Sequence, residues 1–141
     1  MPVFSHIIVG ARDLARMSRF YDALLAPLGL VRGPAEEGGD GGPPGVLWVR
    51  PGRRWPQFYV QEPFNGLPAT WGNGMQVSFA APSPAAVEAA WRAALEAGGR
   101  DEGAPGPRPH YGADYYGAYL RDPEGNKLCV VHTADLAADL D

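Results

Sequence analysis

Residues 6–29 read HIIVGARDLARMSRFYDALLAPLG, and residues 76–99 read QVSFAAPSPAAVEAAWRAALEAGG. Each stretch opens with a short β-rich run, passes an N-cap residue, continues with apolar residues at helical spacing and ends in glycine. One ungapped shift of 70 residues places Asp13 on Ser83, cap on cap, and aligns the terminal glycines. Agreement of several features at one offset is typical of an internal repeat. The sequence therefore predicts a domain made of two copies of one strand-helix-strands unit.

Working outward from these stretches, alternating apolar residues predict the remaining strands. We expect strands at 3–9, 30–32, 46–50 and 56–61 in the first copy, and at 75–80, 115–121 and 127–132 in the second. Glycine and proline at 33–45 and again at 100–113 predict two turn-rich loops. We therefore expect one domain over 1–141, with module one at about 1–66, module two at about 73–133, and a short tail at 134–141 that forms a turn or two of helix.

Composition restricts the class of protein. The chain has 141 residues, 45% hydrophobic and 20% charged, with a net charge of −4, which suits one globular domain. This acidic balance offers no basic face for nucleic acid, and no apolar run approaches the ~20 residues of a membrane-spanning helix. Cys129 is the single cysteine and the first residues lack a signal-peptide pattern, so we expect a cytoplasmic protein with no nucleic-acid or membrane partner.

The segment Tyr119–Asn126, YLRDPEGN, is similar to a turn between the last two strands of the vicinal-oxygen-chelate superfamily. That superfamily includes glyoxalase I, bleomycin-resistance proteins and extradiol dioxygenases, and 103–116 resembles its bacterial glyoxalase-like subgroup. The opening strand with His6, the acidic cap and Phe20-Tyr21 resemble its first module. The resemblance implies an α+β fold in which two tandem βαβββ modules form a curved, mostly antiparallel half-barrel sheet around a cavity. It also implies a small-molecule ligand or substrate and a homodimer.

The resemblance further implies which positions would hold a metal ion. In metal-using members the first and last strands of each module supply four ligands, typically His, Glu or Gln. Carried onto this chain, those positions are His6, Tyr59, Gln76 and Cys129, with Gln57 as the other inward-facing choice in module one. The implied cofactor is one divalent ion (Zn, Fe, Mn or Ni), and the substituted ligands leave open that none is bound.

Each of these residues also has an ordinary structural interpretation. His6 could be a barrel histidine hydrogen-bonded to Gln76 without an ion, and Cys129, between Leu128 and Val130, could be a small buried apolar residue. The residue set lacks the carboxylate that would act as a base in glyoxalase chemistry.

Aromatic and polar side chains predict a ligand pocket. The expected ligand-binding residues are Trp48, Gln57, Arg108, His110, Tyr111, Tyr115 and Tyr119. Sheet packing for Tyr119 and a solvent-facing loop for His110 are the alternatives, and Trp55 and Trp71 could line the cavity of module one or cover its edge.

Two functional hypotheses follow from these residues, with a third behind them. One is a glyoxalase- or dioxygenase-like enzyme, a metal-dependent lyase or dioxygenase with a degenerate metal site that acts on or binds a small oxygenated or aromatic molecule. The other is a metal-independent binding protein of the bleomycin-resistance, sequestering kind. A structural role with a vestigial pocket is the third.

Overall fold

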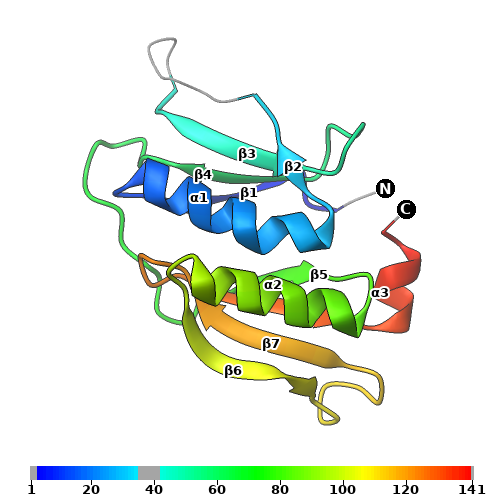
Figure 1. Cartoon of the computed structure of the whole chain (residues 1–141). Coiled ribbons are helices and arrows are strands. Elements are labelled where there is room, and N and C mark those ends of the chain that lie inside the picture. The colour runs from blue at the N-terminus through cyan, green and yellow to red at the C-terminus, as the bar shows by residue number, and fades with distance from the viewer. Residues whose placement is uncertain (1–2, 35–41, 141) are drawn as a thin grey trace.

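The computed structural model describes residues 3–34 and 42–140, and its elements repeat in the order that the 70-residue shift predicts (Figure 1). Module one contains β1 (His6–Gly10), α1 (Leu14–Leu25), the short 3-10 helix η1 (Ala26–Leu28), β2 (Val31–Arg32), β3 (Gly45–Val49) and β4 (Gln57–Gln61). Module two contains β5 (Val77–Ala80), α2 (Pro84–Glu96), β6 (Arg100–Pro107), β7 (Tyr116–Arg121) and β8 (Lys127–His132), and α3 (Ala134–Ala138) follows.

Each module forms its own four-stranded sheet. The strand order is β1-β4-β3-β2 in one sheet and β5-β8-β7-β6 in the other, so equivalent strands occupy equivalent places. The first and last strands of each module pair in parallel, and the other pairs are antiparallel. This arrangement confirms the expected α+β fold of two tandem βαβββ modules with mostly antiparallel, open sheets.

Local capping explains where the two main helices begin. The Asp13 carboxylate accepts the backbone N–H of Arg16 at 3.0 Å, and the Ser83 hydroxyl accepts that of Ala86 at 3.1 Å, as the sequence predicts. At the end of the first helical segment Gly29 has φ 85°, a left-handed conformation that glycine adopts at little cost.

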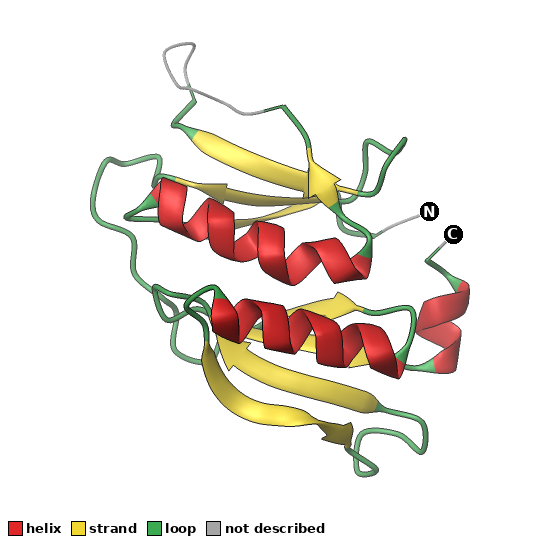
Figure 2. Cartoon of the chain, in the orientation of Figure 1, coloured by secondary structure: helices red, strands yellow, loops and turns green. Residues whose placement is uncertain are grey.

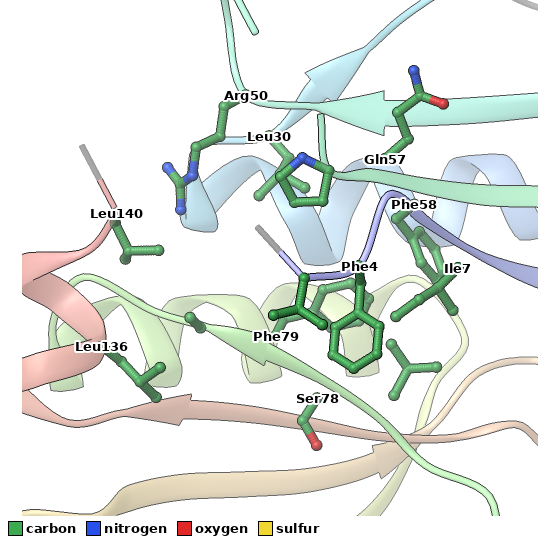
Figure 3. A pocket seen from close by; sticks show the side chains of 14 residues that line it. Phe4, Ile7, Leu30, Arg50, Gln57, Phe58, Ser78, Phe79, Leu136 and Leu140 are labelled. Carbon is green, nitrogen blue, oxygen red and sulfur yellow. The ribbon is translucent and has the colours of Figure 1, made fainter. Parts of the chain in front are cut away.

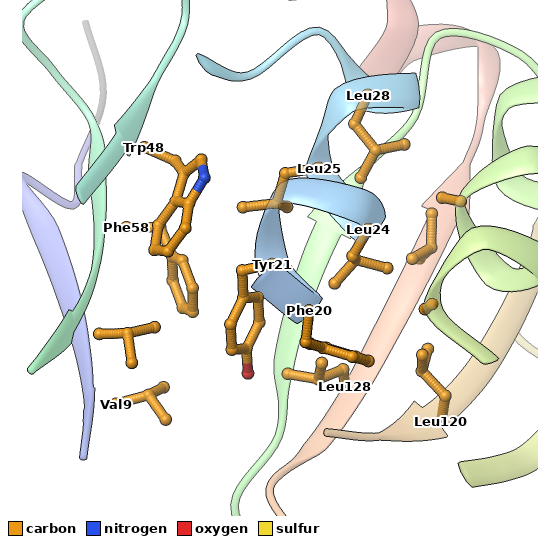
Figure 4. Close-up of a cluster of buried hydrophobic side chains, with 14 of the residues drawn as sticks. Val9, Phe20, Tyr21, Leu24, Leu25, Leu28, Trp48, Phe58, Leu120 and Leu128 are labelled. Atoms are coloured by element: carbon orange, nitrogen blue, oxygen red, sulfur yellow. The ribbon is translucent and has the colours of Figure 1, made fainter. Parts of the chain in front are cut away.

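The helices α1 and α2 lie side by side and cover the same side of the two sheets (Figure 2). Beneath them a single apolar core extends through both modules (Figure 4). Its aromatic rings are close: Tyr21 and Phe58 have centroids 4.9 Å apart, and Phe58 lies 5.0 Å from Phe79 of module two. The face of the sheets opposite the helices is not covered by them and is therefore available for a binding site.

The turn that joins β7 to β8 is held by a buried carboxylate. One oxygen of Asp122 accepts the backbone N–H of Glu124 and of Asn126, and the other accepts the Asn126 side-chain amide. Asp122 is 3% exposed, and burial raises its pKa above the ordinary value despite these hydrogen bonds. A proline at 123 and a left-handed Gly125 complete the tight turn that the sequence predicts.

The same turn also connects the modules. The buried Tyr21 hydroxyl of α1 donates to Asp122 at 2.6 Å. The Glu124 carboxylate accepts the backbone N–H of Arg12 at 2.7 Å and of Asp13 at 2.8 Å, two donors at the start of α1. We call these contacts the turn clamp. A carboxylate at a helix N-terminus is favourable because it meets unpaired N–H groups and the positive end of the helix dipole.

The strand β6 corrects one prediction, since its residues were expected to form a loop. It pairs with β7 in an interrupted register, with irregularities between Asp101 and Gly103 and between Gly103 and Gly106. The prolines at 105 and 107 are tolerated because β6 is an edge strand, where a missing N–H removes no inner ladder bond. Among the described residues, no helix is both long and apolar enough to cross a membrane.

Candidate functional site

Strand alternation decides which side chains reach the open face of module one. Phe58 and Val60 of β4 are buried in the core beneath the helices, so Gln57 and Tyr59 point to the opposite face. The parallel register pairs His6 with Gln57 and Ile8 with Tyr59, which brings the predicted residues of β1 and β4 together.

These residues line a shallow hollow of about 430 Å³ on module one. The His6 ring lies 6.2 Å from the Tyr59 ring and 6.3 Å from the Trp55 ring, measured between centroids. The imidazole is exposed, and its Nδ1 is 2.9 Å from the Ser5 hydroxyl. The structure thus places His6 beside Tyr59 and Gln57 on an open surface.

Module two carries a second group on its open face. Tyr119 is opposite Cys129 in the β7–β8 pair, and Cys129 is opposite Ser78 of β5. The Tyr115 hydroxyl lies 3.2 Å from the Tyr119 hydroxyl and 3.7 Å from the Cys129 sulfur. The Gln76 amide donates to the Ser78 hydroxyl at 2.9 Å, so Gln76 joins the edge of this group.

Burial controls the ionisation of this group. Cys129 is fully buried, and desolvation raises the pKa of its thiol above the ordinary value. The pKa of Tyr115 is raised chiefly by burial, and its hydrogen bond to Tyr119 adds to the shift. The thiol and the phenol are therefore both neutral at physiological pH.

Cations and further aromatic rings surround Tyr119. Arg108 and Lys127 each lie 5.7 Å from its ring centroid. The Arg108 guanidinium donates to the carbonyls of Gly106 and Ala104 at 2.9 and 2.8 Å, so its hydrogen bonds tie this side chain back to β6.

Of the other predicted ligand-binding residues, most lie on this side of module two. The rings of His110 and Tyr111 are 4.1 Å apart, and Tyr111 is 5.3 Å from Tyr115, so these three predicted residues form a continuous row with Tyr119. Trp48 differs: it is 1% exposed under α1, where its indole N–H donates to Asp22 at 3.0 Å. Its alternation in β3 directs it toward the core and away from the open face.

These positions do not match the requirements of a catalytic divalent metal. Such sites usually have three protein ligands, and a cysteine ligand must be deprotonated. Here the single imidazole, His6, is exposed on module one, while Cys129 is a buried, protonated thiol against Tyr115 on module two. Within 3–34 and 42–140, no three His, Cys, Asp or Glu side chains are grouped so that they could hold a metal ion. The residues present therefore do not fit the metal that the fold family implies.

A second cavity lies between the modules (Figure 3). It has a volume of about 440 Å³ and is formed by the segment before β1, the ends of β1, β4 and β5, and the residues around α3. We call it the junction cavity. Its lining residues are mostly apolar: Val3, Phe4, Ile7, Leu30, Arg50, Pro56, Gln57, Phe58, Val77, Ser78, Phe79, Ala80, Leu136 and Leu140.

Sequence reasoning identified Gln57, which lines both the junction cavity and the module-one hollow, but missed the other cavity residues. One signal was present in the sequence. Val3 and Phe4 near one end of the chain and Leu136 and Leu140 near the other are large apolar residues in short segments that cannot bury them locally. In the structure they line the cavity, but Val3 and Phe4 stay largely exposed, at 90% and 69%.

The fold and these open-face residues define the class of protein. A family model described as Glyoxalase-like domain matches residues 6–131, and the chain belongs to this family. This match, together with a solved glyoxalase/bleomycin resistance protein that is 41% identical, confirms the resemblance.

Particular relatives show how far the likeness extends. A glyoxalase/bleomycin resistance protein from Albidiferax ferrireducens T118 is 41% identical, with a TM-score of 0.76 over 94% of this chain and 99% of that one. A glyoxylase/bleomycin resistance protein/dioxygenase domain from Frankia sp. EAN1pec is 16% identical, with a TM-score of 0.72 over 96% and 94%. A glyoxalase I variant from Zea mays is 15% identical, with a TM-score of 0.70 over 94% of this chain and 45% of that one. The last two show the fold alone. Comparison with curated proteins finds no match.

Proposed function

We propose that this protein binds a small apolar or aromatic molecule in the junction cavity without a metal ion. The cavity is the observation that carries the proposal. At about 440 Å³ it falls within the roughly 300–1,000 Å³ of ordinary ligand sites, and its walls are apolar with a few polar groups, as such sites usually are.

The donor set supports binding without metal. Metal-assisted lyase or dioxygenase chemistry needs an ion that polarises a substrate oxygen, with ligands that hold it in place. The Cys129 thiol is protonated, and within 3–34 and 42–140 no three His, Cys, Asp or Glu side chains are grouped so that they could hold an ion. No carboxylate is among the four positions that the superfamily pattern assigns, so a proton-transfer base is also lacking there.

The proposal includes a cytoplasmic location and a homodimer. A single, buried, free Cys129 suits a reducing compartment. A homodimer accords with the superfamily resemblance.

Ligand binding is tested by titration with 1-anilinonaphthalene-8-sulfonate, with and without EDTA, and by thermal shift with added Zn²⁺, Mn²⁺ or Ni²⁺. We expect saturable fluorescence enhancement that EDTA does not change. The variant Ala80→Phe, which fills part of the cavity, should weaken binding at least fivefold, whereas Ala89→Phe on the exposed face of α2 should not. Binding only after metal is added would instead support the enzymatic alternative.

A further inference from the structure

Because the modules are repeats, the turn at one end of the module junction can be compared with the equivalent turn at the other end. The turn clamp closes the end where α1 begins, through Asp122 and Glu124. In module one the shift places Gly52 on Asp122 and Arg54 on Glu124, so the equivalent turn has no carboxylate to make the same contacts. At this other end the structure has the junction cavity, whose wall includes Leu30, just after the first helical segment.

The open end carries one charged residue. Of the described residues that line the junction cavity, Arg50 alone bears a charge. Figure 3 shows its side chain reaching from module one toward Leu140. The guanidinium rests near the backbone at Gly29, where an added Cβ would lie 3.5 Å from Arg50 Nη1.

Some other arginines of this module, Arg12 and Arg32 among them, have hydrogen-bond or ion-pair partners within the described chain, whereas the side chains of Arg19, Arg53 and Arg54 are like that of Arg50 in forming none. Arg32 forms an ion pair with Asp22 at 2.7 Å, and Arg12 donates to the Ala69 carbonyl at 2.7 Å. Across 3–34 and 42–140, the Arg50 guanidinium takes part in no hydrogen bond or ion pair. A half-buried guanidinium beside apolar walls is best stabilised by an anion that accepts two parallel hydrogen bonds from it, as a carboxylate does.

We propose that the junction cavity selects an amphipathic carboxylate, with the carboxylate on Arg50 and the apolar chain against Phe4, Ile7 and Phe79. This inference rests on the proposed function and adds the chemical class of its ligand. The apolar chain supplies affinity, since each methylene that it buries is removed from water. The guanidinium supplies selectivity for the charged head group over a neutral one.

The test compares decanoate with 1-decanol, which has the same chain and no charge. Each competes with 1-anilinonaphthalene-8-sulfonate at pH 7.5, in the whole chain and below the micellar concentration. We expect decanoate to bind at least tenfold more tightly than decanol. Arg50→Gln should abolish this difference and leave the decanol affinity unchanged, and Arg50→Lys should retain part of it because the charge is kept but the bidentate geometry is lost.

The control is Arg53→Gln, an exposed arginine of the neighbouring turn that does not line the cavity. It should keep the wild-type preference for decanoate. Equal binding of decanoate and decanol by the wild type would overturn the carboxylate inference and leave the cavity function standing. Failure of both probes to bind would overturn both. A preference for decanoate that survives in Arg50→Gln would place the anion on another residue and refute the assignment.

Discussion

Replacing Tyr21 by Phe tests whether the hydrogen bond between the modules contributes to stability. The change keeps the ring in the core and removes one hydroxyl, which donates to the buried Asp122 carboxylate at 2.6 Å. A hydrogen bond to a charged group contributes about 1.5–3 kcal/mol, so we expect the free energy of unfolding to fall by about 2 kcal/mol. Urea denaturation followed by tryptophan fluorescence measures this loss.

The loss should also depend on pH. Burial already raises the native pKa of Asp122 above 3.8, and the hydrogen bond from Tyr21 opposes that shift. A carboxyl whose native pKa exceeds its unfolded pKa stabilises the fold most at low pH, and this contribution is lost as the pH rises through the native pKa. Without the hydroxyl the native pKa is higher still, so Tyr21→Phe should destabilise the protein more at pH 7 than near pH 4.

Tyr116→Phe is the matched control. Its hydroxyl donates to the Glu88 carboxylate at 2.7 Å on the exposed side of α2, where solvent competes, so its removal should cost less than about 1 kcal/mol. A loss below about 0.5 kcal/mol for Tyr21→Phe, or a loss equal to that of the control, would refute the argument that the buried bond holds the modules together.

Two further substitutions or treatments follow from the same contacts. Glu124→Ala removes the acceptor of the Arg12 and Asp13 N–H groups, so it should lower the free energy of unfolding by about 1–2 kcal/mol. The control Glu62→Ala, at an exposed site, should change that free energy by no more than about 0.5 kcal/mol. Equal losses for the two variants in urea denaturation would contradict the turn clamp. Because Cys129 is buried and its thiol pKa is raised, 5,5′-dithiobis(2-nitrobenzoate) should label it at least tenfold more slowly in native protein than in urea, and equal rates would show that the thiol is accessible.

The fold was predictable because its signals are local and occur twice. Asp13 and Ser83 cap their helices through hydrogen bonds to residues three positions away. Strand alternation places Phe58 and Tyr59 on opposite faces of the sheet, independently of the rest of the fold. The strand β6 was missed because its prolines and glycines are typical of loops. Pairing with β7 at a sheet edge outweighs that preference, and only the tertiary structure shows it.

The open-face groups were partly predictable for the same reason. Register places His6 beside Tyr59, and Cys129 beside Tyr119, within single modules. Trp48 was assigned to the ligand site from its residue type, but its position in β3 directs it into the core. The junction cavity is lined by residues from both ends of the chain. The apolar pattern of a single segment cannot predict a cavity between two modules.

The two sheets end at β1 and β5, so the junction is a seam between separate hydrogen-bonded ladders. Its width is set by side chains such as Phe58 and Phe79 and by the turn clamp at one end. Opening the unclamped end would move side chains of the two modules relative to one another without breaking a backbone ladder. A ligand whose size differs from that of the junction cavity would therefore require a shift of one module against the other, while the hydrogen bonds within each sheet stay intact.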